Sequence, residues 1–417
     1  MAGTPTRIGS VAFLRKEAGT MNDSKPPLRV DVVVHGRFHA FDLVLGLLGN
    51  GHDVRLITNY PRSVVRRFGV PASAVRTCVS HGIATRIYYR LKQPLRLPDL
   101  EPFLHSWFGR WASTQVRCDA DVVHVFSGVA EEIFQSSRRK PPGEKRPLNM
   151  LVRGSSHIRA QHELLQQEQE RVGTRVEKPL PSIIAREERE YALADRILVL
   201  SKFARDTFLQ YGVPQEKVFI VGLAANLARF APSNAAISER RRRILAREPL
   251  HVLMVGSFTP RKGARDFIEL ATALHGRMRF RFVGDLPPRR SKLERESREV
   301  IDMHARVSEF ELAKHYAWGD VFCFPTIEDG FAAVIVQALA SQLPVLTTPN
   351  CAGPDVIREG MNGWIEPIRS PERLAARLEA CDQDREQLAS MVANMVGTAP
   401  ARSWAIVARE FEEVARG

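Results

Sequence analysis

The feature that most constrains the fold is a rhythm of short, β-branched apolar runs separated by stretches with helical periodicity. In the first half of the chain the runs lie at 29–36, 52–59, 120–127, 148–154, 194–201 and 217–222. In the second half they lie at 250–256, 279–284, 320–325 and 344–348. Near-continuous apolar runs bounded by Gly, Asn and Ser are typical of parallel strands buried on both faces. The pattern therefore predicts an α/β protein with two doubly wound domains.

The two series of runs are separated by a polar segment, ANLARFAPSNAAISERRRR, that carries no strand pattern. We place a domain boundary there, near residue 232. Two doubly wound domains that face each other bring the carboxyl ends of both sheets to one cleft, where ligands of such folds bind. After a break at Pro400, a short amphipathic helix carries Trp404, Val407 and Phe411 on one stripe and must dock on another part of the protein. The expected divisions are a mobile tail at 1–27, domains at 28–232 and 233–398, and the docking helix at 399–417.

Composition indicates a globular protein of more than one domain, since the 417 residues are 44% hydrophobic and 26% charged. No apolar run approaches the roughly 18 residues of a membrane-spanning helix. The first 26 residues lack the apolar segment of a signal peptide. Five scattered cysteines without a C-x-x-C pair indicate neither a disulfide framework nor a zinc site. We therefore expect a cytoplasmic protein without a bound metal.

The formal net charge of +13 calls for anionic partners. The candidates are nucleic acid, an anionic membrane face and phosphorylated small molecules. No nucleic-acid motif occurs, and the basic run Arg240–Arg243 is flanked by Glu239 and Glu248, as on a solvated helix face. Nucleic acid is therefore not expected as a partner.

The first strand of the second half runs into the loop VGSFTPRKG (255–263). Gly256 opens this loop, and Arg261 and Lys262 stand before Gly263. Two cations beside a glycine at the carboxyl end of a strand suit a pyrophosphate, which needs positive charge and close approach of the backbone. Basic loops are also common on solvated surfaces, so this motif alone is a weak signal.

The stretch TIEDGFAAVIVQALASQLPV (326–345) begins an apolar helix with two carboxylates, Glu328 and Asp329, followed by Gly330. A helix N-terminus presents unpaired amides that suit an anion. Asp329 and Gln337 are eight residues apart and fall roughly on one helical stripe. The arrangement predicts a site for an anionic ligand with hydroxyl groups. The competing interpretation is a solvated helix start followed by an ordinary helix-face amide.

Taken together, the motifs resemble the GT-B glycosyltransferases of the group-1 type, family 4. The resemblance rests on ALADRILVLSKFARDTF, VGSFTPRKG, YAWGDVFCFPTIEDGFAAVIVQALASQLPVLTT, REGMNGWIEP and SWAIVAREF, which occur in the family's order. The ordered match extends over residues 28–417. The first half is also similar to a bacterial polysaccharide-assembly subgroup through HGRFHAFDLVLGLL (35–48), LITNYP (56–61) and VRGSSHIRAQHELL (152–165).

The resemblance implies two Rossmann-like domains that face each other across a cleft, and a C-terminal helix that crosses back to the first domain. It implies transfer of a sugar, with retention of anomeric configuration, from a nucleotide diphosphate donor on the second domain to a glycan or lipid-linked acceptor on the first. No metal or other cofactor is implied, because cations and a helix N-terminus carry the leaving diphosphate.

Site residues carry over from the resemblance motif by motif. The groups expected at the diphosphate are Arg261, Lys262 and the amides of Gly330, Phe331 and Ala332. Asp329, assisted by Glu328, is expected at the transferred sugar, and Gln337 at the ribose hydroxyls. Gly256 and Gly36 end strands where the backbone would approach the donor, although at Gly36 a simple tight turn explains the glycine equally well.

The chain departs from the family pattern at two positions. The family has two glutamates separated by seven residues where this chain has Asp329 and Gln337. Many relatives also have arginine where this chain has Ser257, a role that Arg261 can take over. These changes keep two alternatives open: a non-catalytic protein that binds a nucleotide sugar, and another GT-B enzyme such as a nucleotide-sugar epimerase.

His157, which follows the fifth predicted strand, lies where relatives place a histidine near the sugar. Its neutral imidazole can bond a hydroxyl, so we add His157 to Asp329 and Lys262 as a candidate catalytic residue. A structural role is the competing interpretation, and Arg153 is a rival for the same position.

The stretch 86–117 interleaves cations with aromatic residues. Phe103, Leu104, Trp107, Phe108 and Trp111 share one helical stripe, which a helix packed on the sheet explains. The alternative is an interfacial helix that inserts its aromatic side chains into an anionic membrane. A protein with such a helix would bind peripherally to the inner face of the cytoplasmic membrane.

Overall fold

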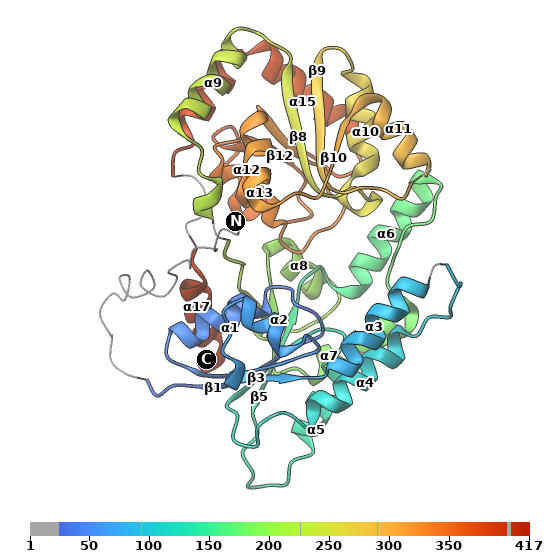
Figure 1. Ribbon diagram of the computed structural model, residues 1–417, viewed down its shortest axis with the longest axis vertical. Helices are drawn as coiled ribbons and strands as arrows, with labels where there is room; N and C mark the ends of the chain where they lie inside the picture. Colours follow the sequence, from blue (N-terminus) through green and yellow to red (C-terminus); the bar gives the residue numbers. More distant parts are fainter. Residues whose placement is uncertain (1–24, 93, 226, 290, 398–401) are drawn as a thin grey trace, which may run out of the picture.

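The structure, a computed structural model, describes residues 25–417 except 93, 226, 290 and 398–401. Most of the tail expected at 1–27 and the break at Pro400 lie outside the described residues. Two α/β units are stacked along the long axis of the molecule, with the first half of the chain below and the second half above in Figure 1. The expected two-domain GT-B architecture is confirmed.

The first domain is built on a parallel sheet with the order β3-β2-β1-β4-β5-β6-β7. Its strands are β1 (Arg29–Val34), β2 (Asp53–Thr58), β3 (Val75–Thr77), β4 (Val122–Phe126), β5 (Leu148–Arg153), β6 (Arg196–Val199) and β7 (Val218–Ile220). Its helices are α1 (Ala40–Gly49), α2 (Arg62–Arg67), α3 (Val79–Lys92), α4 (Glu101–Ser113), α5 (Glu131–Arg138), α6 (Ile158–Val172), α7 (Pro181–Leu193) and α8 (Lys202–Gln210). The central strands are buried along nearly their whole length, as their apolar runs predict.

The second domain repeats the plan with the order β10-β9-β8-β11-β12-β13. Its strands are β8 (Leu250–Ser257), β9 (Met278–Asp285), β10 (Asp302–Ala305), β11 (Val321–Phe324), β12 (Val345–Thr347) and β13 (Gly363–Ile365). Its helices are α9 (Asn234–Leu245), α10 (Ala264–Ala273), α11 (Lys292–Val300), α12 (Glu309–Trp318), α13 (Ala333–Ala340), α14 (Gly353–Val356), α15 (Pro371–Gln383) and α16 (Arg385–Asn394). In both sheets the strand order reverses in the middle, at β1/β4 and at β8/β11, which is where doubly wound folds bind ligands.

The chain passes between the domains over a short segment. Ala224 still packs in the core of the first domain, whereas Phe230 packs edge-on against Tyr316 in the core of the second. The last helix, α17 (Trp404–Arg416), returns to the first domain, where Val407, Ala408 and Phe411 are buried in its core. The Asn50 side chain, at the end of α1, donates to the Ala405 carbonyl oxygen at 3.1 Å. The crossing helix is therefore confirmed.

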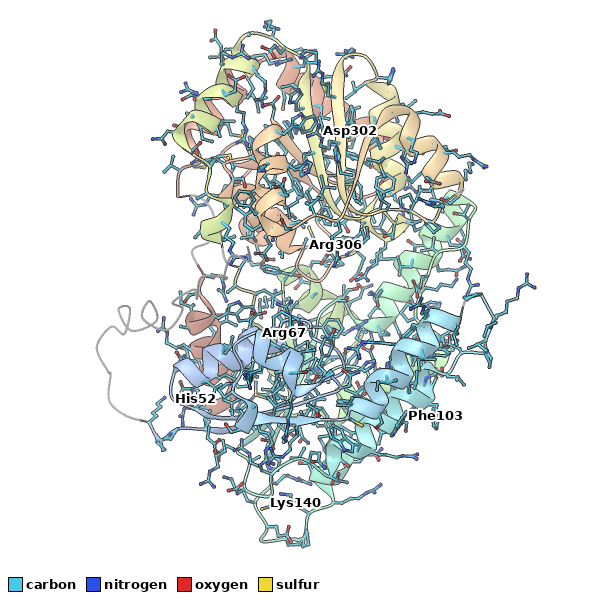
Figure 2. The ribbon with its side chains drawn as sticks, viewed as in Figure 1. His52, Arg67, Phe103, Lys140, Asp302 and Arg306 are labelled. Atoms are coloured by element: carbon cyan, nitrogen blue, oxygen red, sulfur yellow. The ribbon has the colours of Figure 1, made fainter. Side chains whose placement is uncertain are left out.

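The two domains face each other through the carboxyl ends of their strands. Arg67, at the end of α2, and Arg306, after β10, lie on the facing sides of the two domains in Figure 2. Among the described residues, no helix is long and apolar enough to cross a membrane. The junction between the domains is thus formed by loops that follow strands.

Candidate active site at the domain junction

The loop after β8 is pressed against the loop after β11. Gly263 has φ +77°, and a Cβ there would lie 1.8 Å from the Pro325 carbonyl oxygen, so only glycine allows this approach. The Arg261 carbonyl oxygen accepts hydrogen bonds from the amides of Ile327 and Glu328, at 3.0 and 3.3 Å. The two motifs that the sequence singled out, 255–263 and 326–332, therefore form one structure.

Lys262 and Asp329 form an ion pair at the start of α13. Lys262 Nζ donates to Asp329 Oδ2 at 2.6 Å and to the Glu328 carbonyl oxygen at 3.2 Å. Asp329 Oδ1 accepts from the amides of Phe331 and Ala332, at 3.0 and 2.8 Å. Burial raises the pKa of Asp329, but the charge and hydrogen bond of Lys262, together with the charge of Arg261 and the Phe331 amide, hold the pKa below its ordinary value. Asp329 thus occupies two of the three amides expected to bind the diphosphate.

Glu328 ties the second domain to the first. Its side chain is fully buried and accepts a hydrogen bond from Arg261 Nε at 2.7 Å. It also accepts from the amide and hydroxyl of Ser156, both at 2.9 Å, and from Gln161 Nε2 at 3.1 Å. Burial raises the pKa of Glu328, but the charges of Arg261 and Lys262 bring it below the ordinary value. With four donors from two domains, Glu328 is a structural link, a role that its place in the motif did not reveal.

The domains touch directly beside Glu328. A Cβ on Gly330 would lie 2.2 Å from the Gly154 carbonyl oxygen, so this close approach requires glycine. Arg261 Nη2 donates to the Ser155 hydroxyl at 2.9 Å. Both contacts join the loop after β5 to the donor-side motifs, which places the first domain's sheet edge against the expected sugar position.

Arg153 continues this network into the first domain. Its Nη2 donates to Gln161 Oε1 at 2.8 Å, and its Nε lies 3.2 Å from Glu187 Oε2. Gln161 bonds Glu328 in turn, so Arg153 reaches the junction through one side chain. Farther along α6, Arg171 Nη1 lies 2.6 Å from Asp266 Oδ1 of the second domain. Helix α6 is therefore held by the second domain at both its beginning and its end.

His157 is brought to the beginning of α6, where it caps the helix. Its Nδ1 accepts from the Arg159 amide at 3.3 Å, and its ring stacks on Tyr211 with centroids 4.6 Å apart. Burial lowers its pKa to about 4. Within the described residues, no hydrogen bond joins His157 to Lys262 or Asp329. The geometry favours the structural interpretation, and the catalytic role of His157 stays a prediction.

The other candidates lie around this cluster. Gln337, on α13, accepts through Oε1 from the Tyr316 hydroxyl at 3.0 Å, and its amide nitrogen has no hydrogen-bond partner among the described residues. Gly256 lies at the end of β8 with φ +142°, beside the Arg261 loop. Gly36 lies on the opposite side, after β1, where its amide donates to Asn59 Oδ1 at 3.0 Å. Their contacts with a donor stay predictions.

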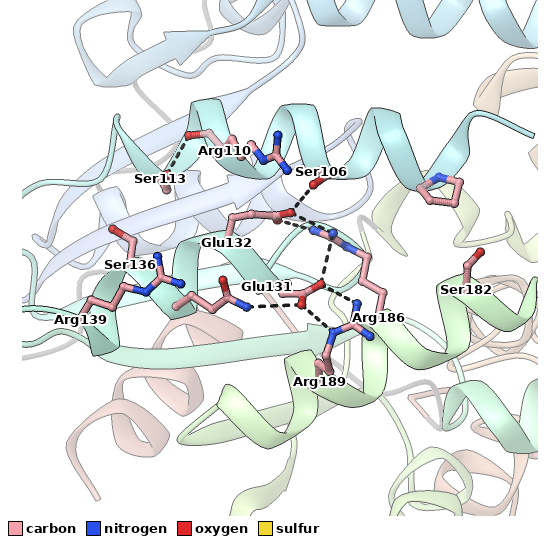
Figure 3. Close-up of a pocket in the computed structure, with 12 residues that line it drawn as sticks. Ser106, Arg110, Ser113, Glu131, Glu132, Ser136, Arg139, Ser182, Arg186 and Arg189 are labelled. Carbon is pink, nitrogen blue, oxygen red and sulfur yellow. Dashed lines mark hydrogen bonds and ion pairs between the residues drawn. The ribbon is translucent and has the colours of Figure 1, made fainter.

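A large hollow of about 670 Å³ lies elsewhere, on the outer side of the first domain. Figure 3 shows it between α4, α5 and α7, with Glu131 and Glu132 bound to Arg189 and Arg186. None of the junction residues lines this hollow. Volume alone therefore does not mark the site that the motifs assemble. Across the described part of the chain, no three His, Cys, Asp or Glu side chains gather to hold a metal ion, and the metal-free mechanism stays a prediction.

Comparison with known proteins agrees with this arrangement. The family described as Glycosyltransferase Family 4 matches residues 37–229, and the family described as Glycosyl transferases group 1 matches residues 249–384. Together the two matches cover both domains. The protein belongs to the group 1, family 4 glycosyltransferases.

Among curated proteins, the chain is 25% identical over 212 residues to the putative colanic acid biosynthesis glycosyltransferase WcaL of Escherichia coli, covering 48% of this chain and 50% of that protein. It is 31% identical over 223 residues to a GDP-mannose-dependent alpha-mannosyltransferase of Mycobacterium tuberculosis, covering 53% and 56%. The chain thus spans about half the length of the curated relatives it matches.

Solved structures show the same fold over nearly the whole chain. The Anabaena protein Alr3699/HepE, solved in complex with UDP, superposes with a TM-score of 0.65 at 13% identity, covering 93% of this chain and 99% of that one. Sucrose-phosphate synthase from Thermosynechococcus elongatus superposes with a TM-score of 0.67 at 16% identity, covering 93% and 98%. At these identities the likeness establishes the GT-B fold.

Proposed function

We propose that the protein is a retaining, metal-independent glycosyltransferase that moves a sugar from a nucleotide diphosphate donor to a glycan or lipid-linked acceptor in cell-surface polysaccharide assembly. The observation that carries the proposal is the Lys262–Asp329 pair, set at the start of α13 between the carboxyl ends of both sheets. A relative described as a putative colanic acid biosynthesis glycosyltransferase and a structural neighbour solved in complex with UDP support the choice of substrate classes.

The cluster has the charges that departure of a diphosphate requires. Without donor, Lys262 is neutralised by Asp329 and Arg261 by Glu328. A diphosphate that approaches the start of α13 would draw Lys262 toward its oxygens and free Asp329 to accept a sugar hydroxyl. Lys262 would then stabilise the charge that develops on the leaving group. Gln337 would bond the ribose through its amide.

We propose that contact with a membrane is made by a different helix from the one that the sequence indicated. On α4, Leu104 and Phe108 are buried, and the Trp107 ring packs against His81 at 5.0 Å. On α3, by contrast, Val79, Ile83, Ile87 and Leu91 form a stripe that is between 37% and 53% exposed. Residues 79–98 also include four cations and no carboxylate. We therefore assign contact with an anionic membrane to this α3 stripe.

A non-catalytic nucleotide-sugar-binding protein is the second candidate. It is favoured by one observation: both oxygens of Asp329 are already hydrogen-bonded in a self-sufficient loop. An epimerase would require further carboxylates around the sugar, whereas the Lys262 cluster at the start of α13 contains Glu328 and Asp329, and Glu328 is already used by its contacts with Ser156 and Gln161.

The experiment that separates these candidates has two stages. A panel of nucleoside diphosphates is first screened by thermal shift, because a ligand that binds the folded state raises its stability with concentration. Nucleotide sugars with the base that binds are then incubated with the protein, and release of nucleoside diphosphate is followed. An active transferase binds and releases, whereas a non-catalytic protein binds without release. Failure of every diphosphate to bind would refute both.

A further inference from the structure

The first domain presents its own set of side chains to the junction, at the ends of β1 and β2. In the sheet, β1 is separated from β5 by β4 alone. Neighbouring strands are about 4.8 Å apart, so the loop after β1 lies roughly 10 Å from the loop after β5. That second loop contains Gly154, which touches Gly330. A molecule bound by the loop after β1 would thus lie roughly 10 Å, about the length of two sugar units, from the loop that contacts the donor-side cluster.

Phe38, in the loop after β1, is held exposed in an unusual conformation. Its φ is +40°, a region that residues with side chains rarely adopt, and such strain is concentrated at binding sites. The ring is stacked on Phe126 with centroids 5.7 Å apart, yet the residue is 68% exposed. An aromatic face kept open in this way is a platform for the apolar face of a sugar ring.

Arg37 precedes Phe38 in the loop after β1, and two further arginines end the helix that follows β2. The Arg37 guanidinium carbon lies 3.9 Å from the centre of the Phe68 ring. Its Nη2 lies 3.9 Å from Asp42 Oδ2. Arg66 and Arg67 form the exposed end of α2, and no described carboxylate pairs with either of them. Arg67 points toward the junction side of the domain in Figure 2. The donor-side cations, in contrast, are both paired with carboxylates.

We propose that Phe38, Arg66 and Arg67 form the acceptor subsite and that the acceptor is a saccharide that carries a phosphate group. This inference rests on the proposed transferase function, since it assigns the acceptor of the same junction. The sugar would lie on Phe38, and the phosphate would take bidentate hydrogen bonds from the arginines, whose planar donors match its oxygens.

The phosphate could belong to a lipid-linked saccharide or to a free sugar phosphate. Helix α3 begins two residues after β3, at the same edge of the sheet as α2. Its exposed apolar stripe starts at this carboxyl edge of the sheet and would accommodate a lipid chain. The chemistry at the arginines is the same in both cases, and the experiment below includes an arm for each source.

The test measures binding by ligand-observed NMR in the Lys262→Gln protein, where one of the two donor-side cations is removed. Probes are glucose 1-phosphate, inorganic phosphate, maltose and farnesyl phosphate. We expect glucose 1-phosphate to bind more tightly than maltose, and Arg66→Gln with Arg67→Gln to weaken it at least about tenfold. The matched control is Arg241→Gln with Arg295→Gln, two exposed arginines of the second domain, which should change nothing.

Phe38→Ala separates the two parts of the subsite. This substitution should weaken the binding of glucose 1-phosphate several-fold and leave the binding of inorganic phosphate unchanged, because only the saccharide touches the ring. Tighter binding of farnesyl phosphate, reduced by Ile83→Gln, identifies the lipid-linked source, and its absence identifies the free sugar phosphate. The proposal is overturned if the arginine pair and the control pair behave alike, or if maltose binds as well as glucose 1-phosphate. Binding of these probes does not depend on nucleotide binding. Failure of the transferase proposal would instead appear in the nucleoside diphosphate binding and release experiment, so the two failures can be distinguished.

Discussion

The two sheet edges that meet at the junction differ in how their charges are satisfied. On the second domain, Arg261 and Lys262 are paired with Glu328 and Asp329, and Glu328 is completely buried. On the first domain, Arg66 and Arg67 are exposed and have no carboxylate partner among the described residues. The charges of the second domain are thus compensated without a ligand, whereas those of Arg66 and Arg67 are left for an anionic ligand to compensate. The difference indicates a pre-organised donor side and an open acceptor side.

The largest effect is expected from breaking the buried network at Glu328. Glu328→Ala removes the acceptor of four hydrogen bonds and leaves Arg261 uncompensated. Loss of one partner of a buried ion pair costs roughly 3–5 kcal/mol of stability. Chemical denaturation measures this loss. Glu188→Ala, which breaks the exposed pair with Arg159, is the control and should cost about 0–1 kcal/mol. Similar small losses for both variants would mean that Glu328 does not join the domains.

The same network predicts instability in acid. The pKa values of Glu328 and Asp329 are lowered in the folded protein, so their contribution is present above the unfolded carboxyl pKa, roughly 4. It is lost as the pH falls below that value through the folded pKa. Denaturation midpoints of the normal protein should therefore decline below about pH 4, and Glu328→Ala should decline less steeply.

Lys262→Ala tests the donor side and should lower transfer or donor hydrolysis by about 10–150-fold. A charge-assisted hydrogen bond to a leaving phosphate contributes roughly 1.5–3 kcal/mol. Lys314→Ala, an exposed lysine on α12, provides the control. Steady-state rates with and without a chelator check the mechanism. Activity that survives Lys262→Ala but disappears with the chelator would show that a metal carries the diphosphate.

The α3 stripe should show an effect on membranes without an effect on the fold. Ile83→Gln with Ile87→Gln should weaken co-sedimentation with anionic vesicles about tenfold or more, since two apolar side chains lose their burial. The melting temperature should hardly change, because both residues are more than half exposed. Trp107→Ala with Trp111→Ala should behave in the opposite way, with a loss of stability and little change in lipid binding. If instead only the tryptophan pair affects lipid binding, α4 is the membrane helix.

The smallest effect is expected at Gln337. Gln337→Ala should weaken the binding of the donor and of the bare nucleoside diphosphate by a similar amount, about 1 kcal/mol of binding free energy each, because the ribose is present in both. Gln337→Glu should be tolerated, since its carboxylate can still accept from Tyr316. Isothermal titration with both ligands measures this. A loss confined to the donor would place Gln337 at the sugar.

The sequence predicted the central strands and the donor-side loops because these depend on local patterns. Apolar runs mark buried parallel strands, and Gly263 beside two cations marks a loop at a strand end. The short edge strands β3, β10 and β13 were not predicted. Strand β10 is largely exposed and lacks an apolar run, and β3 and β13 are only three residues long.

Features of the site that depend on tertiary contacts could not be predicted from local sequence patterns. The first-domain partners of Glu328 are Ser156 and Gln161, more than 160 residues away, and no local pattern connects them with Glu328. Nor could periodicity alone show that α3 exposes its apolar stripe while α4 buries much of its own. His157 shows the same limit, since its aromatic neighbours Tyr191, Phe208 and Tyr211 come from other helices or their ends.

The most direct test of the central claim follows the fate of a nucleotide sugar in the normal protein and in Asp329→Asn. NMR is used to detect the released nucleoside diphosphate and the anomeric configuration of the sugar. We predict release with retained configuration in the normal protein. In Asp329→Asn we predict strongly reduced release with nearly unchanged affinity for the bare diphosphate, which lacks the sugar that Asp329 contacts. Equal release by both proteins, or an inverted sugar, would contradict the assignment of this junction as a retaining donor site.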